Sequence, residues 1–357
     1  MVEKRRLYSL DVLKFLAAIL IVFHHFHQCF GSGNMKILFY KGSVIYYGHL
    51  VEFFFILSGI FMAIKNDVNQ NTAFGKFISK KIIRLMPVAA LSVIVFSILS
   101  AIYFHITQSW WLDIIPTPWN IMKSCLLIFA GGGISDSGVM PNNPIWYLCV
   151  LLICYVWYWL ILWLAKRLAV TPRFMFIAMI FLGMGIITYN ITLPFLNSSA
   201  ARGYIAFFMG VELVDLYKAA LVKCKREICC VSSGVIFLFV VLYVVNAEFF
   251  LTDGQGFLLT FLFFPALICV CVCSEVVRKI FSHRICGTLG AVSFEMYIWH
   301  LVIFMLMITL DAYGMIDFQS EYGTMSGTLL IIIIWGYIVY YLVERPLTEW
   351  LTKKMNV

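Results

Sequence analysis

The sequence predicts an all-helical integral membrane protein, a bundle of about ten transmembrane helices with both ends in the cytoplasm. The chain of 357 residues is 62% apolar and only 12% charged, which is the composition of a membrane protein rather than of a soluble one. Its apolar residues gather in ten runs of helical length. Its Lys and Arg residues gather on one side of those runs, as the positive-inside rule requires.

The ten apolar runs follow one another along almost the entire chain. They fall at residues 8–30, 44–65, 83–106, 144–165, 174–190, 203–217, 228–247, 256–276, 290–310 and 325–343. The first run lacks a small-residue cleavage site and is longer than the apolar core of a signal peptide, so we expect it to remain as the first span. We expect a single membrane domain over residues 1–357, with no soluble domain.

The basic residues set the orientation of the bundle. With the N-terminus inside, Lys4, Arg5 and Arg6 lie in the cytoplasm. Of the 26 Lys and Arg residues, four fall outside: Lys36, Lys41, Lys123 and Arg202. Orientation and contact with anionic lipid therefore explain the net charge of +8, and we expect no nucleic-acid partner.

Lys14 and His25 lie in the first apolar run. Eleven helical steps separate them, so they share one face, on the same stripe as Asp11, about 16 Å apart along the axis. A cation and an imidazole inside a span are costly unless they line a pathway, which indicates a functional site. The alternative for His25 is a packed histidine that bonds a neighbouring helix.

The second run carries Glu52, Ser58 and Gly59. Glu52 is predicted at a depth similar to that of His25, where a carboxylate would fix the imidazole tautomer and raise its basicity. The alternative is a protonated carboxyl satisfied by a hydroxyl. Ser58 and Gly59 are small residues that let helices approach closely or line a narrow passage, and Ser58 has no sequence context of a nucleophile.

Lys80, Lys81 and Arg84 crowd the predicted cytoplasmic entrance of the third helix, with Pro87 expected in its first turn. Cations beside a helix N-terminus favour binding of a polyanion. Topology and anionic lipid provide the alternative explanation. Arg84 lies just inside the span, so topology explains it least.

The outer side carries one long connection, residues 107–143. Within it Ile121–Ala130 is apolar but too short to span, which indicates a re-entrant or interfacial segment. Trp146 opens the fourth helix, where an interfacial aromatic residue is the default explanation. Late in the chain Tyr297 and His300, with Ser293, form a polar stripe near mid-membrane.

The eleven cysteines lie mostly within the runs. Because no pair has the spacing of zinc ligands or of a redox motif, we expect apolar packing and no metal.

Six motifs in fixed order resemble acyltransferase family 3, integral membrane acyltransferases that often act on bacterial surface polysaccharides. Each motif is loose, but together they cover nearly the full length. They are Lys14-x10-His25, the segments 52–59, 81–87 and 146–148, the stripe 293–300 and the end of the last span, 344–346.

The resemblance implies ten helices in the bacterial cytoplasmic membrane, a cytoplasmic acyl-CoA donor (acetyl-CoA as the expected one), and transfer to a hydroxyl of a glycan or other acceptor. The family's first-helix basic residue and histidine correspond to Lys14 and His25, and its paired arginines to Lys81 and Arg84. Lysine keeps the charge at position 81 but loses the bidentate fork. Some glycan-modifying members carry a glutamate where this chain has Leu151 and Leu152, so the acceptor is not carried over.

These assignments give a mechanistic hypothesis. Lys14, Lys81 and Arg84 would bind the CoA phosphates, and His25 would act as general base or transient acyl carrier, oriented by Glu52. Tyr297 and His300 would line the acceptor path or stabilise the oxyanion, and Trp146 and Ser58 are placed on the same path. Membrane lipid is an expected partner, and a homo-oligomer is compatible with the sequence.

The main alternative is a secondary transporter or flippase of a glycan or small solute, in which intramembrane His, Glu and Lys relay protons. The sequence shows no obvious internal repeat, which weighs against the transporter folds built from inverted halves.

Overall fold

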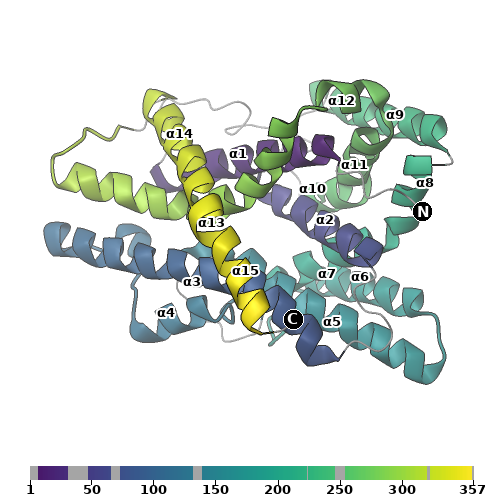
Figure 1. The fold of residues 1–357 in the computed structure, drawn as a ribbon, viewed down its shortest axis with the longest axis horizontal. Helices are drawn as coiled ribbons and strands as arrows, with labels where there is room; N and C mark the ends of the chain where they lie inside the picture. The colour runs from purple at the N-terminus through teal and green to yellow at the C-terminus, as the bar shows by residue number, and fades with distance from the viewer. Residues whose placement is uncertain are drawn as a thin grey trace. The chain divides into compact units, whose positions relative to one another are not determined.

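The structure is a computed structural model that describes residues 7–30, 47–65, 73–131, 139–222, 224–245, 254–319 and 322–355. These residues fold into helices (Figure 1), and the β-type pairing among them is one isolated bridge between Leu193 and Leu196. Six of the Lys and Arg residues used to orient the chain lie outside the described ranges: Lys4, Arg5, Arg6, Lys36, Lys41 and Lys223.

Seven of the described helical segments are long and apolar enough to cross a membrane. They are α1 (Tyr8–Phe30), η1 (Tyr47–His49) with α2 (Leu50–Lys65), α3 (Phe74–Thr107), η3 (Asn143–Ile145) with α5 (Trp146–Leu168), α10 (Gln255–Leu258) with η5 (Leu259–Phe263) and α11 (Phe264–Cys273), α13 (Arg284–Ala312), and α14 (Tyr322–Val339) with η6 (Tyr340–Glu344) and α15 (Arg345–Lys354). The prediction of an all-helical, multi-pass membrane protein is confirmed.

The other described helices connect or flank these segments. They are η2 (Trp111–Asp113), α4 (Pro118–Cys125), α6 (Pro172–Thr188), α7 (Ser198–Glu212), α8 (Val214–Val222), α9 (Lys225–Val245) and α12 (Glu275–Ile280). The remaining three predicted spans overlap α6, α7 and α9, which are not among the seven. The count of ten spans therefore stays a prediction.

The predicted sixth span, 203–217, begins too late. Helix α7 starts at Ser198 because the side-chain oxygen of Asn197 accepts a hydrogen bond from the backbone N–H of Ala200, at 3.0 Å. Such a bond satisfies one of the N–H groups that a helix start leaves without a partner. The helix ends at Glu212, and α8 follows as a separate helix.

The start of α3 also differs from the prediction. The helix begins at Phe74 and contains Pro87 in its interior rather than in its first turn. Residues 74–82 are too polar to belong to an apolar run, so hydropathy alone places the helix start too late. Lys81 and Arg84 consequently lie beyond the first turn, and the unpaired N–H groups of the helix terminus are not beside them.

The long connection of residues 107–143, predicted to lie on the outer side, contacts α3 through the short helix α4. Thr117 caps this helix by accepting a hydrogen bond from Asn120, and Pro118 occupies its first position. The helix spans Pro118–Cys125, so the predicted interfacial segment Ile121–Ala130 is helical only in its first half. Residues 132–138 of this connection lie outside the described ranges.

The chain groups into two compact units, which are described separately below. The first unit comprises the described residues within 1–24, 36–65 and 206–294, and the second those within 25–35, 66–205 and 295–357. Helices α1, α7 and α13 contribute residues to both units. The prediction of a single domain stays a prediction.

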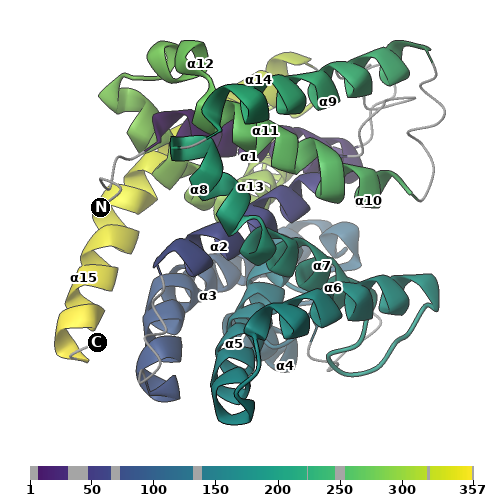
Figure 2. The same cartoon turned by 90° about the vertical axis from the view of Figure 1, so that its right-hand side faces the viewer.

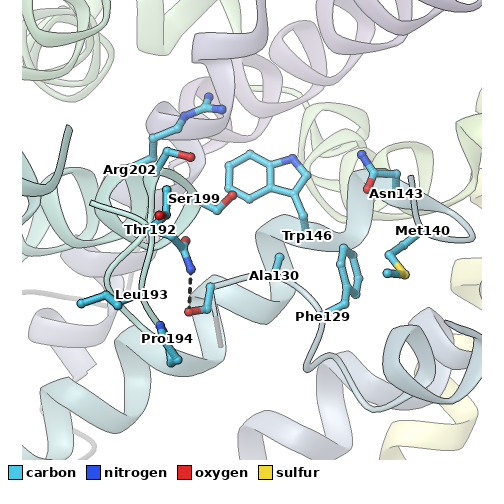
Figure 3. A pocket seen from close by; sticks show the side chains of 13 residues that line it. Phe129, Ala130, Met140, Asn143, Trp146, Thr192, Leu193, Pro194, Ser199 and Arg202 are labelled. Atoms are coloured by element: carbon cyan, nitrogen blue, oxygen red, sulfur yellow. Dashed lines mark hydrogen bonds between the residues drawn. The ribbon is translucent and has the colours of Figure 1, made fainter. Parts of the chain in front are cut away.

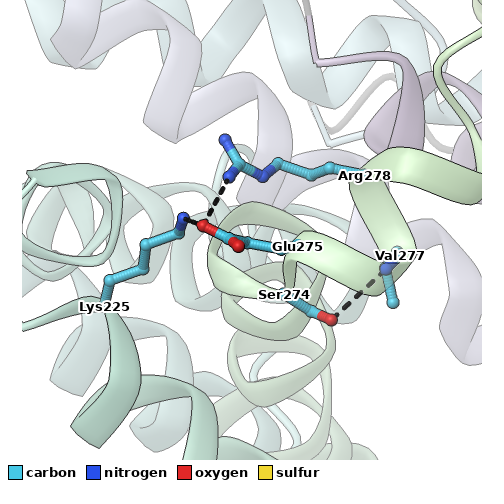
Figure 4. A network of polar contacts seen from close by, with 5 residues as sticks. All are labelled: Lys225, Ser274, Glu275, Val277 and Arg278. Atoms are coloured by element: carbon cyan, nitrogen blue, oxygen red, sulfur yellow. Dashed lines mark hydrogen bonds and ion pairs between the residues drawn. The ribbon is translucent and has the colours of Figure 1, made fainter.

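In the first unit, α11 packs along α9 (Figure 2) and also contacts α8. A surface network joins the start of α9 to the junction of α11 and α12: Lys225 and Arg278 both contact the carboxylate of Glu275, while Ser274 caps α12 (Figure 4). The hydrogen bond from Lys225 and the nearby positive charges lower the pKa of Glu275 below its usual value. Because Glu275 is exposed, the network contributes little to stability.

Helices α2 and α7 touch backbone to backbone within this unit. A Cβ atom at Gly59 would lie 2.0 Å from the carbonyl oxygen of Phe207, and one at Gly210 would lie 2.1 Å from that of Ile56. The two glycines face each other's helix, so neither position has room for a methyl group. The predicted role of Gly59 as a close-approach residue is confirmed.

In the second unit, Asn142 joins three segments. Its buried side-chain amide donates hydrogen bonds to the hydroxyl of Ser92 in α3, at 2.7 Å, and to the carbonyl of Ile298 in α13, at 3.0 Å. Its own backbone is left-handed, with φ of 50°, a conformation that asparagine tolerates better than most residues. Because Asn142 directly precedes η3 and α5, it fixes the start of α5 against both helices.

We expect Gly59→Ala and Gly210→Ala each to lower the free energy of unfolding by about 1–3 kcal/mol, because the added methyl group meets backbone atoms. Gly234→Ala is the matched control, because nothing lies within 4 Å of its Cβ position in α9. It should be neutral or stabilising by about 0.5–1 kcal/mol. Thermal unfolding of the purified variants in detergent measures this, and a Gly59→Ala protein as stable as wild type would contradict the close contact.

Asn142→Ala should destabilise the protein by about 1–3 kcal/mol, because two buried groups lose their hydrogen-bond donor. Asn190→Ala is the control for backbone strain, since Asn190 also has a positive φ, 52°, but is exposed. The difference between the unfolding temperatures of the two variants measures the contribution of the Asn142 hydrogen bonds to stability. Equal unfolding temperatures would show that the Asn142 amide does not hold the segments together.

Candidate active site

Lys14 is held by a carboxylate on its own helix. Its Nζ lies 2.6 Å from Oδ1 of Asp11, which is buried, and 6.0 Å from the centre of the Phe61 ring. Gly290 in α13 makes room for Asp11, because a Cβ there would lie 2.1 Å from Oδ1. Pairing lowers the cost of a cation in an apolar helix. Sequence reasoning noted Asp11 on the Lys14 stripe but missed this pairing, for which the i, i+3 spacing is the signal.

His25 stacks on His300. The ring centres are 5.0 Å apart with 22° between the ring planes. Nδ1 of His25 is 3.0 Å from Oε1 of Gln28, and Nδ1 of His300 is 2.8 Å from the backbone carbonyl of Tyr297. A carbonyl oxygen only accepts, so His300 carries its proton on Nδ1. The same reasoning assigns the proton of His25 to Nδ1, which makes Nε2 the basic atom of that ring.

Tyr297 connects this imidazole pair to the start of α5. Its hydroxyl donates a hydrogen bond to the carbonyl of Pro144, and its ring packs against Tyr147 with ring centres 5.7 Å apart. A tyrosine has a single hydroxyl proton. Because Pro144 takes it, Tyr297 holds the wall of the site in this structure, and donation to an oxyanion would require that bond to break.

Glu52 and Ser58 lie in α2, within the first unit. Glu52 is buried, and its Oε1 lies 3.5 Å from Nδ1 of His49, one turn away on the same segment. Ser58 is half-buried next to Gly59. The orienting role predicted for Glu52 and the path role predicted for Ser58 stay predictions.

Lys81 and Arg84 have different surroundings on α3. The Nζ of Lys81 lies 5.4 Å from the ring centres of both Phe77 and Tyr155, an arrangement typical of cation–π contact. Arg84 is exposed and interacts electrostatically with Glu344 in η6, whose carboxyl group lies beside that of Glu295. In the sequence, Glu344 stands out only as the end of a motif, because the residues around it do not indicate an interaction with Arg84 on α3.

Trp146 lies under a guanidinium group. The Cζ atom of Arg202 is 4.8 Å from the centre of its ring, within cation–π range. Sequence reasoning counted Arg202 only as one of four outer cations, because its neighbour in space is 56 residues away along the chain.

A family model for an acyltransferase domain matches residues 7–345, which is nearly the whole chain. No curated protein and no solved structure matches the chain. The family match agrees with the predicted resemblance and with the multi-pass helical structure. The chain therefore belongs to acyltransferase family 3 and is a membrane acyltransferase.

Proposed function

We propose that the protein transfers an acyl group, with acetyl as the expected one, from cytoplasmic acyl-CoA to a hydroxyl of a cell-surface or lipid-linked glycan. The observation that supports this proposal is the stacked pair of His25 and His300, in which Nδ1 of His25 lies 3.0 Å from Oε1 of Gln28. We propose Nε2 of His25 as the base. Family membership supplies the class of reaction.

In the proposed reaction, Nε2 of His25 takes the proton of the acceptor hydroxyl while the hydroxyl oxygen attacks the thioester carbonyl. The carbon–sulfur bond then breaks, and CoA leaves as a thiol after the imidazolium returns the proton to sulfur. If His25 instead carried the acyl group, Nε2 would attack the thioester first. Intact-protein mass spectrometry after incubation with acetyl-CoA and no acceptor separates the two routes, because only the second adds an acyl group to the protein.

The donor phosphates are proposed to bind the basic residues Lys14, Lys81 and Arg84. The exposure of Arg84 supports this, since the rest of the described protein leaves its side chain uncovered and a guanidinium binds phosphate well. We further propose that ten spans lie in the bacterial cytoplasmic membrane with both ends inside, which puts these cations on the side where acyl-CoA is found.

His25→Ala should lower acyl transfer about 10²-fold or more, because the general base is lost. Added imidazole should restore part of the activity, which a purely structural defect would not allow. His105→Ala, at an exposed histidine in the last turn of α3, is the matched control and should retain activity. Transfer to an added glycan acceptor from labelled acetyl-CoA gives the rate. Full activity of His25→Ala would remove this imidazole from the chemistry.

Arg84→Ala should raise KM for acetyl-CoA about tenfold or more and change kcat little, because a charged hydrogen bond contributes about 1.5–3 kcal/mol. The KM of Arg84→Lys should lie between those of wild type and Arg84→Ala. Lys353→Ala is the control, because Lys353 is an exposed cation of α15, and its KM should match that of wild type. For Lys14 the double variant Lys14→Met/Asp11→Asn is needed, since Lys14→Ala alone would leave Asp11 buried without its cation. Unchanged donor affinity in all these variants would refute phosphate binding by these residues.

A further inference from the structure

A cavity of about 510 Å³ lies in the second unit beside the start of α5 (Figure 3). Three segments of chain line it: residues 129–131 with Met140, the corner that carries Asn143 and Trp146, and the turn from Thr192 into α7. Its volume falls within the range of about 300–1,000 Å³ that is usual for small-molecule sites. A cavity of this size holds a small molecule or the short end of a larger one, rather than the length of a polymer.

Four polar side chains line the cavity without using their hydrogen-bonding groups internally. In the described part of the chain, no hydrogen bond or ion pair involves the side chains of Asn143, Thr192, Ser198 or Ser199. Asn143 and Ser199 are half-buried, whereas Thr192 and Ser198 are exposed, so the set spans both parts of the lining. One amide and three hydroxyls can both donate and accept. A polyhydroxylated ligand offers the alternating donors and acceptors that such a set binds.

Apolar side chains complete the lining. Phe129 and Met140 are buried, and Leu193 is exposed on the turn. Figure 3 shows Phe129 and Met140 on one side of the Trp146 ring, and Thr192 and Leu193 on the other. A sugar ring carries hydroxyl groups at its edge and C–H groups on its faces, so it can contact polar and apolar side chains at once. The mixed lining therefore suits a sugar better than a purely apolar ligand.

One wall of the cavity is rigid. The carbonyl of Gly131, a glycine with φ of 75°, accepts hydrogen bonds from the N–H of Phe195, at 2.8 Å, and from the side-chain amide of Asn197, at 3.0 Å. Tyr204 donates its hydroxyl proton to the carbonyl of Phe195, at 2.8 Å. The turn therefore keeps its shape without a ligand, and such preorganisation favours binding.

A cation–π contact ties α7 to the start of α5 within the lining. The Cζ atom of Arg202 lies 4.8 Å from the centre of the Trp146 ring. Both residues therefore shape the cavity. Recognition of hydroxyl groups by the four polar side chains requires no ligand contact with Arg202.

The cavity lies at the end of α5 that is far from its basic end. Trp146 begins the helix, whereas Lys166 and Arg167 occupy its last turn, about 30 Å away along the axis. In the orientation proposed above, the basic end faces the cytoplasm and the cavity faces the outer side. An acceptor glycan would arrive on that side, opposite the cytoplasmic donor.

The corner beside the cavity also contacts the helix that carries His300. Pro144 accepts the hydrogen bond from Tyr297, and its neighbours Asn143 and Trp146 line the cavity. Tyr297 and His300 are three residues apart on α13, about 4.5 Å along the axis. The cavity and the stacked imidazoles therefore lie on two sides of one short corner of the second unit.

We propose that this cavity binds the acceptor as a single sugar unit or a short saccharide end, which it recognises by the ring hydroxyls. The proposal rests on the proposed acyl transfer and adds the place and the manner in which the acceptor binds. Asn143, Thr192 and the two serines exchange hydrogen bonds with the sugar hydroxyls. The buried apolar side chains contact the C–H groups, and the rigid turn fixes the positions of the polar ones.

The test uses the full-length protein in a detergent without a sugar headgroup, since such a headgroup would compete for the cavity. Ligand-observed NMR measures the binding of glucose, galactose, mannose, rhamnose and N-acetylglucosamine. Cyclohexanol is the reference ligand, because it keeps a six-membered ring but has a single hydroxyl. We expect at least one of the sugars to bind about tenfold more tightly than cyclohexanol, or better, because several hydrogen bonds are gained.

Loss of the hydroxyls should weaken the binding of that sugar. Thr192→Val and Ser199→Ala should each lower its affinity about two- to tenfold, the range of one neutral hydrogen bond. The triple variant, which adds Ser198→Ala to these two, should lower it about tenfold or more. Thr188→Val is the matched control, because Thr188 is an exposed threonine at the end of α6 that does not line the cavity, and its affinity should match that of wild type.

The proposal is overturned if no sugar reaches the expected margin over cyclohexanol, or if the triple variant falls short of its expected loss. It is also overturned if Thr188→Val weakens binding as much as Thr192→Val. Acetyl-CoA binding is measured in parallel, without sugar, and should be unchanged in the triple variant; its loss would mean that the three hydroxyls only support the fold and would overturn the assignment. Failure of the wild-type protein to bind acetyl-CoA would instead refute the proposed acyl transfer, while the sugar probes still decide the acceptor cavity.

Discussion

A single buried amide, that of Asn142, holds the parts of the second unit on which the candidate site depends. It bonds α3 through Ser92 and α13 through the Ile298 carbonyl, and it directly precedes the segment that begins α5. In an apolar interior such bonds are strongly favoured, because the alternative is an unsatisfied polar group. The bond from Tyr297 to Pro144 joins the same two segments two residues further along the chain. Asn142 and Pro144 together therefore tie the start of α5 to α13, the helix that carries Tyr297 and His300.

Every predicted donor-binding cation interacts with a neighbouring side chain. Asp11 pairs with Lys14, two aromatic rings flank Lys81, and Glu344 interacts with Arg84. Restraint reduces the side-chain entropy that a phosphate contact would otherwise cost. It also keeps each charge acceptable in an apolar surrounding before any donor is bound. The three neighbours differ in kind, so we expect the three cations to differ in the strength with which they bind phosphate.

The helical class and most helix positions could be predicted from sequence, because long apolar runs have few alternatives to membrane helices. The predictions erred where polar residues continue a helix, as before Pro87, and where a cap starts one early, as at Asn197. Spacing alone placed His25 on a polar stripe of α1 and placed Tyr297 and His300 on a polar stripe of α13, because helical periodicity fixes which residues share a face. Glu344 and Arg202 could not be assigned roles, because each has its described contact with a distant segment. Gln28 contacts His25 on the same helix, where the i, i+3 spacing is the signal that could have found it.

The double hydrogen bond to the Gly131 carbonyl has an evolutionary consequence. The turn of residues 192–197 is held by bonds to the Gly131 carbonyl, by the Tyr204 hydroxyl and by the pairing of Leu193 with Leu196. The side chains of Thr192, Ser198 and Ser199 take no part in these bonds, so substitutions there leave the path of the main chain in place. Related chains can therefore differ at these positions and keep the same turn.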